Sequence, residues 1–191
     1  MAIQHTSRAG KTYYLHTGPK RGGGVQYFFS TRPTGSLAAH LPDGFEIYDS
    51  VHGQVFLRRT QPRLVREEET DCIERGAATR RGNNLYKVEV RGDTLTVFES
   101  ANQVGALSEL FGAFPPRDRS KQEELRERFA SYQPVLRFIL VDQERRLFAP
   151  ERYCFRGSVD DWIPIGPPEP IKRLATQYLK HLGRDSMFEL I

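Results

Sequence analysis

The sequence predicts an α+β fold in which antiparallel β-hairpins form one or two sheets and helices pack on one face. Strand-like stretches come in neighbouring pairs joined by short turns, which favours antiparallel pairing. Helix-like stretches do not alternate one by one with strands, so a doubly wound parallel sheet is not expected. The 191 residues are 38% hydrophobic and 27% charged, a balance that suits a chain with its own core.

The first third of the chain predicts two hairpins. Residues 1–10 show no regular pattern, whereas 12–17 and 25–31 are rich in aromatic and β-branched types that favour strands. The turn between these strands carries Lys20, Arg21 and three consecutive glycines, whose backbone can take positive φ. We expect a basic, flexible hairpin tip there.

A short helical turn over 37–41 and a second hairpin over 45–48 and 54–57 follow. The first longer helix is expected over 62–76, because proline suits a first helical turn and glycine a helix end. The acidic run at 67–69 favours the beginning of that helix and is interpreted as a solvated face.

The clearest hairpin joins 85–90 to 94–98 across an Arg-Gly-Asp turn at 91–93. The remaining elements are predicted in order as follows: helices over 102–111 and 120–132, a hairpin over 135–142 and 146–156, an irregular proline-rich loop over 163–168, a helix over 169–182 and a docked apolar tail over 187–191. The two adjacent prolines near 115 suggest a division into an N-terminal portion, 1–112, and a C-terminal helix-hairpin-helix portion, 117–191, packed into one compact unit.

The positive charge of the chain is concentrated near its beginning. The formal net charge is +4, and residues 1–60 hold seven basic and three acidic side chains, so they account for all of it. Such an asymmetry favours an anionic partner. The candidate nucleic-acid contacts are Lys11, Lys20, Arg21, Tyr27, Arg32, Arg58, Arg59, Arg80 and Arg81.

Exposed strand aromatics would add base stacking to these phosphate contacts. Only alternate strand residues share a face, so the stacking candidates are Tyr13 or Tyr14 on the first strand, and Tyr27 and Phe29 on the second.

Several chemistries lack their residue patterns. The segment 18–24 has glycines and cations but no closing Lys-Ser/Thr and no helix after it, so no nucleotide loop is predicted. The two cysteines, Cys72 and Cys154, lie far apart, which indicates free, buried thiols. We expect no cofactor and no bound metal.

The sequence therefore favours a non-enzymatic binding module that contacts nucleic acid or another acidic partner through its basic N-terminal hairpin. One alternative is an accessory factor that docks through the loop from Trp162 to Pro168 and the tail from Met187 to Ile191. Another is a metal-dependent hydrolase. Its candidate residues are His40, Asp43 or Asp49 and His52, or Asp160 and Asp161. A cytoplasmic location without membrane association is expected, and the oligomeric state stays open.

Overall fold

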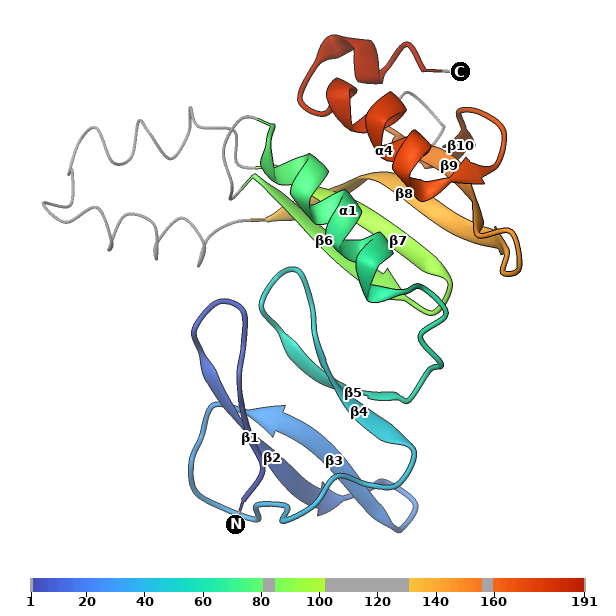
Figure 1. Ribbon diagram of the computed structural model, residues 1–191. Coiled ribbons are helices and arrows are strands. Elements are labelled where there is room, and N and C mark those ends of the chain that lie inside the picture. The colour runs from blue at the N-terminus through green and yellow to red at the C-terminus, as the bar shows by residue number, and fades with distance from the viewer. Residues whose placement is uncertain (1, 81–84, 102–130, 156–159, 191) are drawn as a thin grey trace, which may run out of the picture. The chain divides into compact units, whose positions relative to one another are not determined.

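The computed structural model describes residues 2–80, 85–101, 131–155 and 160–190. The chain forms two compact units, of which the first includes residues 2–60 and the second includes the other described residues. The predicted α+β class is confirmed: every ladder between described strands is antiparallel, and helices accompany the larger sheet (Figure 1). The predicted boundary between 112 and 117, the helix expected over 102–111 and residues 120–130 of the helix expected over 120–132 lie outside the described residues. The predicted end of that second helix is wrong, because Tyr132 begins a strand.

In residues 2–60, the described part of the first unit, the regular secondary structure consists of strands. β1, β2 and β3 form a three-stranded sheet in that order, and β4 pairs with β5 (Figure 1). The strands are β1 (Gln4–Thr6), β2 (Thr12–Pro19), β3 (Val25–Ser30), β4 (Phe45–Asp49) and β5 (Val55–Arg59). Both predicted hairpins are thus present, at nearly the predicted bounds.

Two predictions for this unit are wrong, and both concern the edge of β2 that does not pair with β3. Residues 4–6 are not irregular but form β1 along β2. Leu37 does not begin a helical turn; it bridges to His16, and the Ala38 amide donates a 2.8 Å hydrogen bond to the Leu15 carbonyl. Buried backbone groups need hydrogen-bond partners, and both segments supply them to β2 from outside the hairpin.

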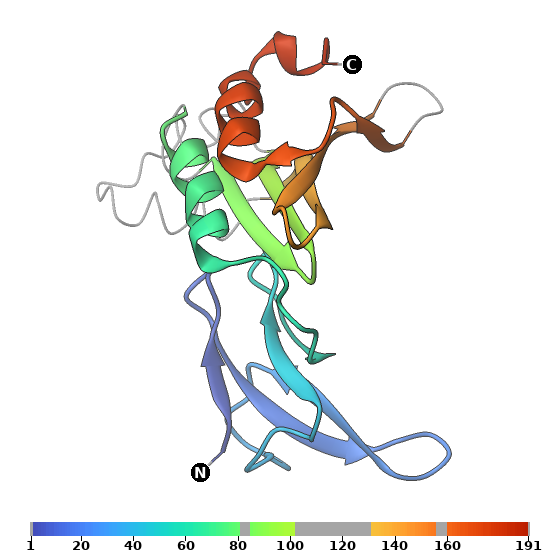
Figure 2. The same cartoon turned by 45° about the vertical axis from the view of Figure 1, so that its right-hand side comes forward.

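The second unit is built on a larger sheet in the order β10-β9-β8-β7-β6, with β11 also paired to β9. Two helices, α1 and α4, cover one face of this sheet (Figure 2). The elements are α1 (Glu67–Ala78), β6 (Tyr86–Arg91), β7 (Thr94–Ser100), β8 (Tyr132–Asp142), β9 (Leu147–Cys154), β10 (Asp161–Pro164), β11 (Glu169–Pro170), α4 (Ile171–Tyr178), η1 (Leu179–His181) and η2 (Asp185–Met187).

The irregular loop predicted over 163–168 is partly wrong, because β10 includes Ile163 and Pro164. β10 ends the sheet on one side, and proline is tolerated in an edge strand because no further strand requires its missing amide hydrogen.

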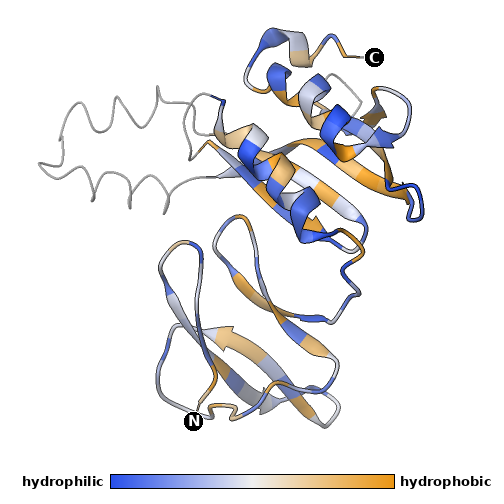
Figure 3. Cartoon of the chain, viewed as in Figure 1, coloured by the Kyte–Doolittle hydropathy of each residue, from blue (hydrophilic) through white to orange (hydrophobic). Residues whose placement is uncertain are grey.

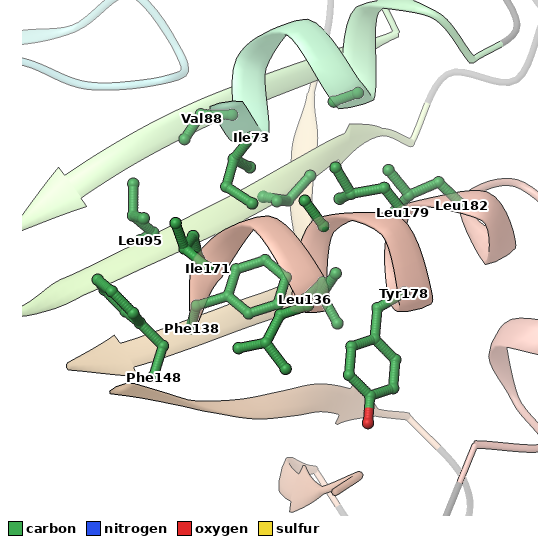
Figure 4. Close-up of a cluster of buried hydrophobic side chains, with 14 of the residues drawn as sticks. Ile73, Val88, Leu95, Leu136, Phe138, Phe148, Ile171, Tyr178, Leu179 and Leu182 are labelled. Atoms are coloured by element: carbon green, nitrogen blue, oxygen red, sulfur yellow. The ribbon is translucent and has the colours of Figure 1, made fainter. Parts of the chain in front are cut away.

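The core of the second unit lies between the helices and the sheet. Leu136 and Phe138 of β8 are fully buried beneath Ile73 of α1 and Ile171 of α4 (Figure 4). Hydropathy alternates along the strands, and the turn between β8 and β9 is strongly hydrophilic (Figure 3). The alternation places one apolar row per strand under the helices, as expected for a sheet covered on one side.

Helix α1 begins later than predicted and does not present all its acids to solvent. Its N-cap is Arg66, whose backbone amide donates a 2.8 Å hydrogen bond to the Glu69 carboxylate. Glu67 and Glu68 are exposed, but Glu69 is buried and bound by Arg146. The prediction of a solvated acidic face is therefore wrong for Glu69. Its carboxylate is buried, and the positive charge of Arg146, which is distant in sequence, compensates it.

Neither cysteine is in a disulfide, with Cys154 buried and Cys72 half-buried. Among the described residues, no helix combines the length and apolar character needed to cross a membrane.

Candidate nucleic-acid interface

The tip of the β2–β3 hairpin is an ordered turn. The last strand pair is Pro19 with Val25, and beyond it the Lys20 amide donates to the Gly24 carbonyl at 3.1 Å. The glycines at 22–24 have φ values of 94°, 96° and 90°. Three consecutive residues with such positive φ values require glycine, since a β-carbon is disfavoured in this backbone conformation. The tip projects from the remainder of the first unit (Figure 2).

Four of the predicted cations are exposed and form no ion pair with another described residue. Lys20 and Arg21 lie at the tip, Arg32 follows β3, and Arg59 ends β5. Within residues 2–60, none of these four side chains forms an ion pair. Their charges are therefore available to an external anion.

Lys11 and Arg58 contact aromatic rings. The Lys11 Nζ lies 5.8 Å from the centre of the Tyr13 ring. The Arg58 guanidinium lies 4.4 Å from the centre of the Tyr48 ring, and its Nε donates a 2.7 Å hydrogen bond to Glu46. Arg58 is thus largely neutralised by its own hairpin.

The carboxylate of Asp49 is also engaged within the first unit. Its Oδ2 accepts a 2.7 Å hydrogen bond from the Arg8 amide and lies 3.3 Å from the His5 Nε2. With Glu46 bound to Arg58, Asp43 is the one of the three acids in 1–60 that has no hydrogen-bond or ion-pair partner among the described residues. The positive excess of this segment is therefore not cancelled locally.

Two of the predicted contacts, Arg80 and Arg81, do not belong to the described part of the first unit. Arg80 is half-buried and lies in the second unit, just after α1. Arg81 lies outside the described residues. The other seven of the nine predicted residues belong to the first unit: Lys11, Lys20, Arg21, Tyr27, Arg32, Arg58 and Arg59.

The strand register reveals an aromatic residue that sequence reasoning missed. Tyr27 and Phe29 are half-buried and share a face with the buried Leu15, because Leu15 pairs with Phe29. Phe28 points to the opposite face and is 44% exposed. Its ring stacks on His16, with centres 5.4 Å apart and planes at 14°.

The sequence feature that could have indicated the position of the Phe28 ring is Gly18, a glycine inside a strand. A glycine inside a strand often marks a close approach of another group. A β-carbon built on Gly18 would lie 3.4 Å from the Phe28 Cε1 atom, so the ring lies beside the glycine backbone.

The segments of the accessory-factor alternative take part in the fold of the second unit. The Trp162 ring lies 4.3 Å from the Arg137 guanidinium and 5.0 Å, edge to face, from Tyr153. In the tail, Met187 is buried and the Leu190 carbonyl accepts a 2.8 Å hydrogen bond from the Arg152 Nε. The predicted docking of the tail is confirmed for Met187 and Leu190, whereas Phe188 is exposed.

The described residues contain no group of three or more His, Cys, Asp or Glu side chains arranged to hold a metal ion. No family model, no curated protein and no solved structure matches this chain. Its function is therefore argued from the residues of the first unit.

Proposed function

We propose that the protein is a non-enzymatic binding module that contacts nucleic acid, or another acidic partner, through the β2–β3 hairpin and the cations beside it. The supporting observation is the set of exposed cations Lys20, Arg21, Arg32 and Arg59, which form no ion pair with another described residue. Within residues 2–60, two of the three acids are already engaged by other groups. Polyanion binding follows from such a set because phosphate contacts release condensed counterions. The proposal places the protein in the cytoplasm, in keeping with its free cysteines.

Binding of labelled DNA and RNA to the full chain, measured across salt concentrations, tests this function. Each phosphate contact with a single strand contributes about −0.7 to the slope of log affinity against log salt. Replacing Lys20→Glu together with Arg21→Glu should weaken binding of every sequence and make the slope shallower by about 1.4.

The matched control is Lys172→Glu with Lys180→Glu. It changes the net charge equally but on exposed positions in α4 and η1 of the second unit. If the control weakens binding as much as the hairpin variant, the contact depends on net charge and the hairpin site is wrong. Absence of DNA and RNA binding at low salt, combined with binding of an acidic polypeptide, would assign the site to an acidic protein.

A further inference from the structure

Resting on the proposed function, we infer that the hairpin takes single-stranded nucleic acid, with one base stacked on Phe28 and neighbouring phosphates bound by Lys20 and Arg21. The inference depends on how the Phe28 ring is held, on the charges around it, and on what form of nucleic acid has a free base face.

The Phe28 ring is exposed yet held in one orientation. One side of it stacks on His16, which is buried, and the His16 Nε2 is hydrogen-bonded to the Arg32 carbonyl at 2.9 Å. The ring also lies against Gly18. Because the opposite face of the strand carries the core residue Leu15, Phe28 cannot turn into that core. A fixed, exposed ring loses little conformational freedom when a base stacks on it.

A second exposed aromatic stack in residues 2–60, formed by Phe56 and Tyr48, differs in the charges of the side chains beside it. Phe56 lies 6.4 Å from Tyr48, centre to centre, on the hairpin face that also carries Glu46 and Arg58. Glu46 would repel a phosphate there, and Arg58 is already bound to it. Around Phe28, in contrast, the hairpin itself contributes only cations: Lys20 and Arg21 at its tip and Arg32 beyond its end.

The spacing along the hairpin suits a short stretch of nucleic acid. Lys20 pairs with Gly24, which is four residues from Phe28, so the tip lies about 13 Å from the ring along the strand. A base on Phe28 and phosphates at the tip can therefore belong to one strand, a few nucleotides apart.

A single strand fits this surface better than a duplex. In a duplex both faces of an interior base are covered by its neighbours, whereas a single strand offers unstacked bases to aromatic side chains. A flat exposed ring beside unpaired cations is the arrangement by which single-strand-binding proteins combine stacking with phosphate contacts.

The test compares a labelled single strand of about 12 nucleotides, within the site sizes of single-strand binders, with its duplex. Fluorescence anisotropy of the full chain gives both affinities. Phe28→Leu keeps an apolar side chain but removes the ring, and should weaken single-strand binding roughly 5- to 150-fold. Duplex binding and the salt slope should change little. Phe28→Tyr should retain the affinity, and Phe56→Leu is the matched control.

Photo-crosslinking of wild-type protein to a bromouracil-containing single strand provides a second measurement that needs no variant. Crosslinks should map to the peptide that contains Phe28. The inference is overturned if Phe28→Leu leaves single-strand binding unchanged, if the duplex binds as tightly as the single strand, or if crosslinks map elsewhere. Absence of any nucleic-acid binding by the wild-type protein would instead refute the nucleic-acid form of the proposed function, on which this inference rests.

Discussion

The ion pair between Arg146 and Glu69 allows a stability prediction worked from the structure. The Arg146 Nε donates to the Glu69 Oε1 at 2.9 Å, its Nη2 donates to Oε2, and the same Nη2 donates to the Leu64 carbonyl at 3.2 Å. The two side chains are only 18% and 8% exposed. Truncating the arginine would therefore leave a buried carboxylate with the Arg66 amide as its remaining hydrogen-bond donor among those described.

Breaking a buried pair by removing one member costs about 3–5 kcal/mol. We expect about 3 kcal/mol for Arg146→Ala, because the Arg66 amide and the partial exposure of the pair reduce the loss. Arg146 also has φ = 53°, a left-handed backbone that costs a residue with a β-carbon about 1 kcal/mol. Arg146→Gly loses the same ion pair but relieves this strain, so it should destabilise by about 2 kcal/mol.

The effect should depend on pH. Burial alone would raise the pKa of the Glu69 carboxyl. The hydrogen bonds from the Arg146 side chain and the Arg66 amide, together with the positive charges of these two arginines, outweigh burial and lower the pKa below its ordinary value. A lowered pKa in the folded state stabilises the protein above the unfolded-state pKa, and this stabilisation is lost as pH falls through the folded pKa. The gap between wild type and Arg146→Ala should therefore be full at neutral pH and shrink in acid, below the ordinary value of 4.5.

Urea unfolding followed by tryptophan fluorescence measures this gap. Trp162 is the single tryptophan of the chain and lies in the second unit, so its signal reports the unit that contains the ion pair. Arg145→Ala, at the exposed neighbouring position, is the control and should change little. The reasoning fails if both Arg146 variants stay within about 0.5 kcal/mol of wild type, or if glycine destabilises more than alanine.

Three further predictions concern packing and turns. Gly166→Ala should destabilise by about 1–3 kcal/mol, because its β-carbon would lie 2.2 Å from the Tyr178 hydroxyl oxygen, and Tyr178→Phe should reduce that penalty in a double-mutant cycle of unfolding free energies. Gly23→Ala meets no atom within 4 Å, so only backbone strain of about 1 kcal/mol should lower the stability of the first unit in chemical denaturation. Arg137→Ala should shift the fluorescence of Trp162, whose ring it covers, while a spectrum identical to wild type would contradict that contact in solution.

The hairpins could be predicted because their determinants are local. The turn that contains Gly92 is flanked by alternating apolar residues, and the ladder from Tyr86 to Arg91 forms as expected. The edge segments could not be predicted, because β1 and Leu37 pair with β2 through backbone groups that any sequence carries. Likewise, the acidic run in α1 gave no sign that Glu69 would be buried, since Arg146 lies 77 positions away.

For the candidate site, the sequence by itself determined the charge and the turn. Lys20 and Arg21 before three glycines imply a basic tip in any fold, because glycine alone tolerates those backbone angles. Which aromatic row faces outward was decided only by the tertiary structure. Alternation separates Tyr27 and Phe29 from Phe28, but both rows are aromatic and each lies opposite a buried residue of β2, Leu15 or His16. Only the tertiary packing leaves Phe28 44% exposed while Phe29 is half-buried.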